Sequence, residues 1–172
     1  MTVLSDSRIK YYCRHGLVSP YDERLVGPAS LDVRLGDNLK IEDPSGNGLT
    51  TLSISDKNKE NPYHLSGFTL GHTLETFRIP DNLCAFFILK SARGREGISH
   101  ALSGFADPGW ENSRLTLELH RLLRFSCPHI WPGMRIGQFV FMEMSDIPEK
   151  SYREVGHYNN DLTVMESKGY FD

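Results

Sequence analysis

One carboxylate stands in an otherwise apolar run near the middle of the chain. Residues 115–119 read LTLEL, with Glu118 as the single charged residue. Strand alternation places Thr116 and Glu118 on one face and the leucines, Leu117 among them, on the other. Taken alone, this pattern fits an antiparallel sheet in which the face with Thr116 and Glu118 is exposed to solvent. It equally fits a buried carboxylate, which is costly to keep unless its proton affinity is used.

A basic segment lies upstream of this run. Residues 90–97 read KSARGREG and combine a hydroxyl, two glycines and three cations, Lys90, Arg93 and Arg95. Glycines let backbone N–H groups approach phosphate oxygens, and arginine binds them through paired, charge-assisted hydrogen bonds. The sequence leaves two interpretations open, a phosphate-binding loop or an ordinary basic turn between strands.

The segment SGFADPGWENS, residues 103–113, contains an Asp-Pro-Gly turn. Such turns are common, but Asp107 could accept a hydrogen bond from a sugar hydroxyl. Phe105 or Trp110 would then line a pocket or simply pack in the core. Taken with Glu118 and the basic segment, this turn favours a polyanionic nucleotide bound beside a general base.

Length and composition narrow the class of protein. A chain of 172 residues suits one domain, residues 1–172, and a net charge of −3 argues against bulk nucleic-acid binding. No apolar run is long enough to span a bilayer, and the N-terminus carries charges where a signal peptide needs an apolar core. We therefore expect no membrane partner and a location in the cytoplasm, or in the host cytoplasm if a phage encodes the chain.

The cysteines are three in number and far apart. Cys13, Cys84 and Cys127 form no C-x-x-C pair, so neither a disulfide framework nor a structural zinc site is expected. The same spacing excludes the zinc-dependent deaminases, which need a P-C-x-x-C set. Any hydrolysis must therefore activate water without zinc, and Cys84, in an apolar run, is predicted to be a core residue.

The hydrophobic pattern predicts a mainly β protein. A helix should begin after Ser5 and end at Gly16, with Ile9, Tyr12 and Cys13 on one face. Short β-branched and aromatic runs then alternate with turn residues, as in a sandwich or barrel. These runs are LDVRLG, FTLGHTLETFRI, LCAFFILK, RLTLELH and IGQFVFMEM.

Three other stretches are predicted from composition. Residues 43–63 are polar and rich in turn formers, which indicates a long surface loop or excursion. PGM, residues 132–134, should turn tightly into the last of these strands. Residues 156–172 show no period, so they form either a disordered tail or an arm that orders over a ligand or a neighbouring subunit.

The order of these motifs resembles the dCTP deaminase branch of the dUTPase-like superfamily. The matching segments are LSDSRI, GLVSPYD, VGPASLDVRLG, FTLGHTLETFRIP, KSARGREG, FADPGW, TLEL and PGMRIGQFVF, and they span roughly residues 4–144. The resemblance implies a dUTPase-like β-barrel or jelly-roll-type (β-clip) fold with a short N-terminal helix. It also implies a homotrimer with active sites at subunit interfaces and a C-terminal arm, residues 145–172, that closes over the nucleotide.

The resemblance also assigns chemistry. Glu118 matches the general base that takes a proton from water as hydroxide attacks C4 of cytosine, giving the uracil nucleotide and ammonia. Ser91 matches the residue that holds the water or leaving group, and Arg95 the one that supports Glu118 and the phosphates. Ser103 lies where a backbone carbonyl positions the water, and Asp107 where the sugar 3′-hydroxyl binds. The remaining implied nucleotide contacts are Lys90, Ala92, Arg93, Gly94, Thr116, Leu117, Gln138, Tyr152, His157 and Asp161.

Magnesium would be carried on the phosphates, with no metal cage in the protein. Several features depart from the family pattern. Ala92 replaces a phosphate-binding serine, and Arg93 adds a cation. The stretch from Trp110 to Thr116 is one residue longer than usual, which suggests a bulge, and His157 and Asp161 replace a lysine and a glutamine of the arm.

These departures leave alternatives open beside the deamination of dCTP to dUTP. One is a dUTPase or a bifunctional deaminase-pyrophosphatase that forms dUMP, and another is a deaminase of dCMP or modified dCTP. A third is a nucleotide-binding regulator without turnover. Feedback inhibition by dTTP also stays open.

Overall fold

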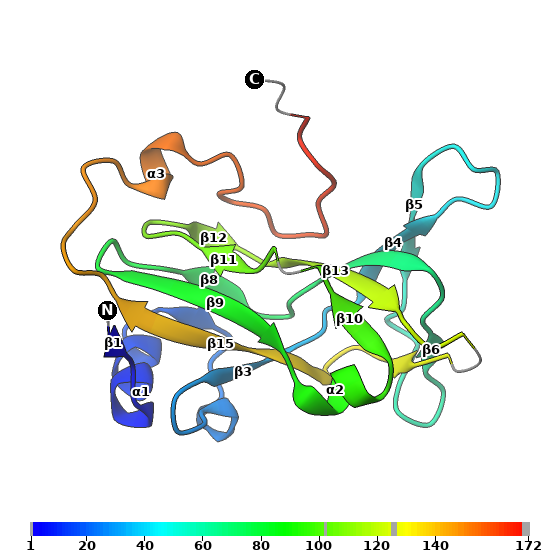
Figure 1. The fold of residues 1–172 in the computed structure, drawn as a ribbon, viewed down its shortest axis with the longest axis horizontal. Helices are drawn as coiled ribbons and strands as arrows, with labels where there is room; N and C mark the ends of the chain where they lie inside the picture. The colour runs from blue at the N-terminus through cyan, green and yellow to red at the C-terminus, as the bar shows by residue number, and fades with distance from the viewer. Residues whose placement is uncertain (1, 102, 125–126, 170–172) are drawn as a thin grey trace.

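The computed structural model describes residues 2–101, 103–124 and 127–169, and two five-stranded antiparallel sheets form its body (Figure 1). The first sheet follows the order β1-β15-β9-β11, and β3 also pairs with β15. Its strands are β1 (Thr2–Val3), β3 (Leu31–Arg34), β9 (Leu83–Leu89), β11 (Phe105–Ala106) and β15 (Arg135–Glu143). The second has the order β10-β13-β7-β4-β5. Its strands are β4 (Asn38–Glu42), β5 (Leu49–Ser53), β7 (Phe68–His72), β10 (Ile98–His100) and β13 (Thr116–Arg121).

Smaller elements complete the fold. Three strands, β2 (Val18–Ser19), β8 (Thr76–Arg78) and β12 (Glu111–Ser113), form one small sheet, and β6 (Tyr63–His64) pairs with β14 (His129–Ile130). The helical segments are α1 (Asp6–Arg14), η1 (Glu23–Leu25), α2 (Ser91–Arg95) and α3 (Tyr152–Val155). The predicted mainly β fold with a short N-terminal helix is therefore confirmed, although the strands form open sheets. In the described part of the chain, no helix has the length and apolar character needed to cross a bilayer.

The core lies between the sheets because each strand turns its apolar face inward. Phe77, Phe139 and Phe141 are almost fully buried, and Phe139 contacts both of the other rings. On the first helix, Ile9 and Cys13 face this core as predicted. The predicted core position of Cys84 is likewise confirmed, since it is 1% exposed within β9.

Three sequence predictions need correction. Residues 90–97 were expected to form a loop, but 91–95 form the single helical turn α2, closed by a bond from Gly94 N–H to the Lys90 carbonyl. Residues 43–63 were expected to be a long surface loop or excursion. Part of the stretch is instead a strand, because β5 pairs with β4 across a tight turn, residues 43–48, and Thr50, Thr51 and Leu52 favour a strand. The expected run at 68–79 divides into β7 and β8, since the Thr73 hydroxyl bonds to the Glu75 carbonyl at the break.

Two irregularities were predicted correctly. The longer segment after Trp110 carries a register shift in β12, with Asn112 in the left-handed region at φ 51°. This is the geometry of a β-bulge. The turn at residues 132–134 is confirmed as well, because Gly133 has φ 79° and Met134 N–H bonds to the Trp131 carbonyl.

The C-terminal arm runs along one side of the molecule, over β12 and toward the β4–β5 hairpin (Figure 1). Its described part ends at residue 169, so the last three residues of the predicted arm lie outside the described residues. Val164 is 2% exposed, and Asp161 accepts a bond from Arg114 N–H through its carbonyl. The described part of this segment packs on its own chain, and closure of the arm over a nucleotide stays a prediction.

Candidate active site

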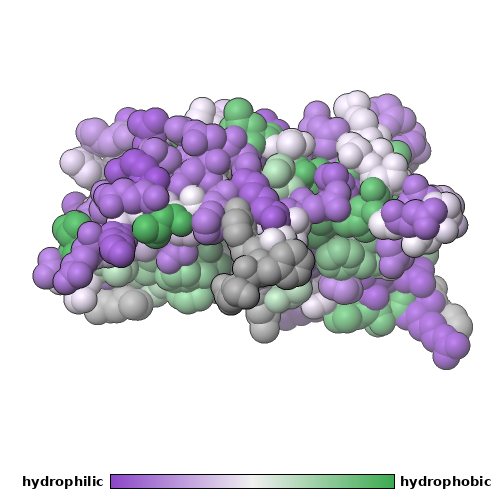
Figure 2. Space-filling model, turned by 90° about the horizontal axis from the view of Figure 1, so that it is seen from above, coloured by the Kyte–Doolittle hydropathy of each residue, from purple (hydrophilic) through white to green (hydrophobic). Residues whose placement is uncertain are grey.

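A cavity of about 550 Å³ lies between β13, the β11–β12 segment and the C-terminal arm. This volume is within the usual range for small-molecule sites. Figure 2 views the molecule from the arm side, where hydrophilic residues predominate and smaller hydrophobic patches interrupt them. The lining residues are Leu49, Phe68, Leu70, Ser103, Phe105, Asp107, Trp110, Arg114, Leu115, Thr116, Glu118, Tyr152, Tyr158, Asp161, Met165, Glu166 and Ser167.

Glu118 faces this cavity. Leu117 and Leu119 are fully buried on the other side of β13, and the side chain of Glu118 is 25% exposed. Thr116 and Glu118 therefore share the cavity face, as strand alternation predicts. The arm covers this face, and Met165 N–H donates to the Thr116 hydroxyl. The face is thus a pocket wall and not an open sheet surface.

Two side chains hold the Glu118 carboxylate. The Ser103 hydroxyl donates to Glu118 Oε2 at 2.5 Å. His100 Nε2 lies 3.1 Å from the same oxygen. That nitrogen is buried with no well-aligned hydrogen-bond partner, so the contact is a close approach of the ring to the carboxylate and not a well-aligned hydrogen bond. His100 reaches this place because β10 pairs with β13, with His100 opposite Leu119.

These neighbours set the proton affinity of Glu118. Burial raises the pKa of the carboxyl, but the contacts with His100 and Ser103 together outweigh burial, so the pKa lies below its ordinary value. The carboxylate is therefore ionised at neutral pH. A general base must begin its reaction in this form.

Asp107 and two aromatic residues form the next part of the wall. Burial raises the pKa of Asp107. Trp110 is 6% exposed and packs on Phe77, while Phe105 is 45% exposed and contacts Phe86. Both interpretations of these aromatic residues are therefore partly right, because each lines the cavity and also packs.

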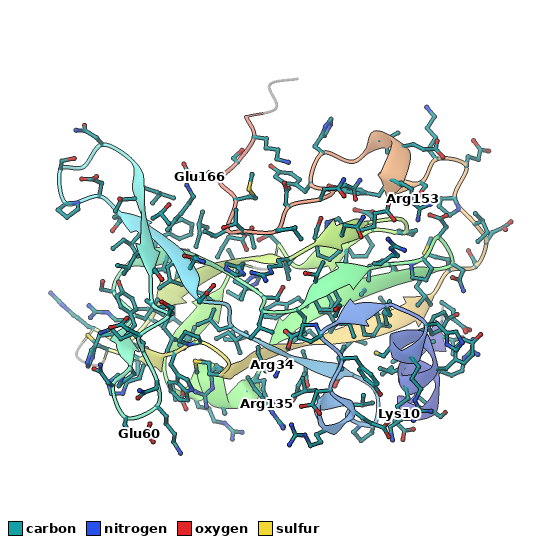
Figure 3. All side chains as sticks on the ribbon, turned by 180° about the vertical axis from the view of Figure 1, so that it is seen from behind. Lys10, Arg34, Glu60, Arg135, Arg153 and Glu166 are labelled. Carbon is teal, nitrogen blue, oxygen red and sulfur yellow. The ribbon has the colours of Figure 1, made fainter. Side chains whose placement is uncertain are left out.

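The arm is fastened above the cavity by polar contacts. Trp110 Nε1–H donates to the Tyr158 carbonyl at 2.9 Å, and Ser113 Oγ–H donates to the same oxygen. At the far end of the arm, Lys40 Nζ lies 2.6 Å from a Glu166 oxygen. Figure 3 labels Glu166 beside the β4–β5 hairpin and Arg153 at the opposite end of the arm. The arm therefore spans the whole length of the pocket.

Asp161 has a cation of its own. Lys168 Nζ donates to both Asp161 carboxylate oxygens, at 2.9 and 3.1 Å, and also to the His157 carbonyl at 2.6 Å. An isolated aspartate here would repel a phosphate, but this ion pair neutralises it. Asp161 and Tyr152 line the cavity, whereas the exposed His157 does not.

The basic segment lies elsewhere in the same chain. Among the described residues that line the cavity, none comes from residues 90–95. Lys90 Nζ lies 2.7 Å from Asp32, and Gln138 accepts a bond from the Ser30 hydroxyl at 3.2 Å. Gln138 lies close to this segment because β15 pairs with β9. Figure 1 shows α2 on the side of the molecule away from the arm.

The predicted site thus falls into two groups within one chain. The cavity brings together Glu118, Ser103, Asp107, Thr116, Tyr152 and Asp161. The second group consists of Lys90, Ser91, Ala92, Arg93, Gly94, Arg95 and Gln138. Leu117 contributes to the core. The roles of both groups stay predictions.

Sequence reasoning missed three residues of the site. No sequence motif identifies His100, because it reaches the site only through the pairing of β10 with β13. Tyr158 lies in the arm between His157 and Asp161, and of these three residues the resemblance assigns a nucleotide contact only to His157 and Asp161. Arg114 could have been found, since it lies in the segment that is one residue longer than usual. No group of three or more His, Cys, Asp or Glu side chains is arranged for a metal ion within residues 2–101, 103–124 and 127–169.

Comparison with known proteins decides the family. Residues 3–144 match the family model described as dCTP deaminase-like. The chain belongs to this family. A protein of Beutenbergia cavernae named "dCTP deaminase, dUMP-forming" is 37% identical over 163 residues, covering 87% of this chain and 84% of that protein. A protein of the same name from Methanosphaera stadtmanae is 32% identical and covers 98% of this chain and 91% of that protein.

A solved structure shows the same fold. It is the crystal structure of 2′-deoxycytidine 5′-triphosphate deaminase from Agrobacterium tumefaciens, with a TM-score of 0.62 and 21% sequence identity. The match covers 81% of this chain but only 47% of the solved chain. The dUTPase-like fold implied by the resemblance is thereby confirmed.

Proposed function

We propose that this protein hydrolytically deaminates a cytosine deoxynucleotide, converting dCTP to dUTP and ammonia. One observation carries the proposal: Glu118 is ionised inside a nucleotide-sized cavity, with the Ser103 hydroxyl at 2.5 Å and the arm overhead. The family membership and the names of the relatives support the same chemistry.

The reaction needs one group that both takes and returns a proton. Glu118 accepts a proton from water, and the resulting hydroxide attacks C4 of the cytosine ring. The carboxyl passes that proton to the ring nitrogen N3 as hydroxide adds to C4. It then takes the proton of the new C4 hydroxyl and delivers it to the 4-amino group, so that the C4–N bond breaks and ammonia leaves as the C4 carbonyl forms. Water and dCTP are consumed, and dUTP and ammonia are produced. Ser103 and His100 keep the carboxylate ionised and fixed before the proton is taken.

We further propose that the working site joins two chains in a homotrimer. The cavity of one chain lacks the basic segment, so a second chain would supply Ser91 and Arg95 to Glu118. An exposed apolar face on the first sheet supports association, since Phe86, Ile88 and Phe105 are each 45–48% exposed. Such a face is typical of a surface that another protein covers.

A mixing experiment tests this arrangement. Arg95→Ala and Glu118→Gln should each be inactive alone, because each removes one half of every site. Mixed trimers, formed by unfolding and refolding the two variants together, should regain ammonia release at interfaces that carry both wild-type halves. Failure to regain any activity, with trimers present by light scattering, would contradict a shared site.

Magnesium would enter with the phosphates. Lys168 already binds Asp161, so this carboxylate is poorly placed as a metal ligand. Phosphate oxygens and water would then supply most of the ligands, which suits the coordination habits of Mg²⁺. When bound, the ion would neutralise phosphate charge.

A second candidate function is formation of dUMP. Its support is that the two relatives described above both carry the name "dUMP-forming". This activity would require a second water in line with the α-phosphate, and Asp107 is the cavity carboxylate in the motif that could orient one. Pyrophosphate would leave as dUMP forms.

One assay separates these candidates. dCTP, dCMP and dUTP are each incubated with the protein and Mg²⁺, and the products are resolved by chromatography. Formation of dUTP from dCTP supports plain deamination, and dUMP with pyrophosphate supports the second candidate. If dCTP and dCMP stay unchanged while dCTP binds, the chain is a nucleotide-binding regulator and the proposal is wrong.

A further inference from the structure

Among the described residues, one lysine or arginine lines the cavity, and no carboxylate pairs with its charge. Of the described residues that line the cavity, Arg114 alone carries a lysine or arginine side chain. It follows the bulge in β12 and precedes β13, so it stands in the segment that is one residue longer than usual. Its backbone N–H donates to the Asp161 carbonyl at 2.8 Å, which fixes the main chain beneath the arm.

Of the four described carboxylates that line the cavity, three are already engaged, and the fourth is Asp107. Glu166 has Lys40 at 2.6 Å, Asp161 has Lys168 at 2.9 Å, and Glu118 has Ser103 and His100. In contrast, Arg114 Nε is buried without a hydrogen-bond partner, and within the described residues no carboxylate lies in ion-pair range of its guanidinium. A guanidinium has five N–H donors, and a buried donor without an acceptor is costly.

The charge of Arg114 is felt within this region. Burial lowers the pKa of His72, and the nearby charge of Arg114 lowers it further. His72 is fully buried and stands opposite Thr116 in the neighbouring strand. Its ring is therefore neutral at neutral pH and adds no second positive charge beside Arg114.

The spacing between Arg114 and Glu118 matches the length of a nucleotide. Arg114 lies four positions before Glu118, and an extended chain of that length spans about 13 Å. Beyond Glu118 the wall is apolar, with Leu49, Phe68 and Leu70, which suits a base. Tyr152 and Asp161 gather at the Arg114 end. A nucleotide with its base at Glu118 can therefore extend its phosphates toward Arg114.

We propose that Arg114 binds the phosphate groups of the nucleotide from within the same chain as Glu118. The assignment rests on the proposed function, because it takes the base to lie at Glu118. The guanidinium would donate paired hydrogen bonds to phosphate oxygens, which satisfies its buried N–H group. It would add to the cations of residues 90–95 brought by a neighbouring chain.

Binding measurements in proteins that carry Glu118→Gln test this assignment without turnover. Titration calorimetry compares dCTP, deoxycytidine and inorganic tripolyphosphate, each with Arg114 intact and with Arg114→Gln. The loss of a charged hydrogen bond should weaken dCTP and tripolyphosphate binding about ten- to hundredfold, and leave deoxycytidine binding unchanged. Arg114→Lys keeps the charge but lacks the planar guanidinium, so its affinity for dCTP should lie between that of the parent protein and that of Arg114→Gln. Arg24→Gln, at an 86% exposed side chain outside the cavity, is the matched control.

The outcomes distinguish this assignment from the proposed function. Equal weakening of dCTP and deoxycytidine would show that Arg114 maintains the pocket and does not read phosphate, which overturns the assignment alone. Unchanged dCTP binding in Arg114→Gln would do the same. If the parent protein binds no dCTP at all, both the proposed function and this assignment are wrong. The thermal midpoint of each variant shows that the fold is intact.

Discussion

The bond from Ser103 to Glu118 offers a direct test of how the general base is prepared. In Ser103→Ala the hydroxyl that donates to Glu118 Oε2 at 2.5 Å is removed. A hydrogen bond to a charged group is worth about 1.5–3 kcal/mol, so the ratio of ionised to protonated Glu118 should fall about ten- to hundredfold at a given acid pH. Because Glu118 is 25% exposed and His100 stays beside it, the lower end of this range is expected.

The sign of the effect follows from the protonation states. Only the ionised carboxylate accepts the bond, and the pKa of Glu118 lies below its ordinary value once His100 and Ser103 outweigh burial. The wild-type protein should therefore lose kcat/KM only when the pH falls through this low pKa. In Ser103→Ala, kcat/KM should begin to fall at a higher pH than in the wild-type protein, while kcat/KM at neutral pH is kept.

The assay is the pH dependence of kcat/KM for ammonia release, since this quantity reports the free enzyme. Ser99→Ala is the matched control, because Ser99 lies in β10 opposite His120 and its side chain has no recorded bond to Glu118 among the described residues. A uniform loss of activity at every pH, with the acid limb in place, would refute the reasoning. It would show that Ser103 acts on the substrate or water and not on the carboxylate.

Two further predictions concern the scaffold. Glu75 is 1% exposed, and its carboxylate accepts bonds from the Arg34 side chain at 2.6 Å and from the Arg34 backbone N–H at 2.9 Å. Glu75→Ala should therefore lower the free energy of unfolding by about 3 kcal/mol in denaturant titrations. A change below about 1 kcal/mol would contradict a buried, structural pair. Cys127 is exposed, while Cys13 and Cys84 are buried, and burial raises the pKa of the Cys13 thiol to about 12. A maleimide should therefore label one thiol per native chain and three after unfolding, as measured by mass spectrometry. Rapid labelling of all three thiols in the native protein would contradict the described packing.

Local pattern predicted much of this fold because the physics of strands is short-ranged. The alternation in residues 115–119 correctly placed Glu118 and the leucines on opposite faces of the strand, and the leucines face the core. The length of the segment after Trp110 correctly indicated the bulge, since an extra residue in one strand has few other places to go. Alternation could not decide whether the face that carries Glu118 is exposed to solvent, because the arm that covers it lies some forty residues later in the chain.

The missed features depend on distant pairing or on weak local signals. His100 is part of the site only because β10 pairs with β13, and no spacing in the sequence announces that contact. The β4–β5 hairpin could not be predicted because the turn-forming residues 43–48 dominate the composition of the stretch that contains β5. The helical turn α2 was read as a loop, since its glycine and short length give little helical period. Whether its cations meet Glu118 depends on a second chain, which lies beyond what one sequence determines.

The role of Glu118 is the central claim, and its replacement by glutamine tests it most directly. Glu118→Gln keeps the shape of the side chain but cannot take a proton from water. Steady ammonia release from dCTP should fall by at least about a hundredfold while titration calorimetry still detects dCTP binding. Glu149→Gln, at an exposed carboxylate outside the cavity, should release ammonia at the wild-type rate. Near-native turnover by Glu118→Gln would contradict the account.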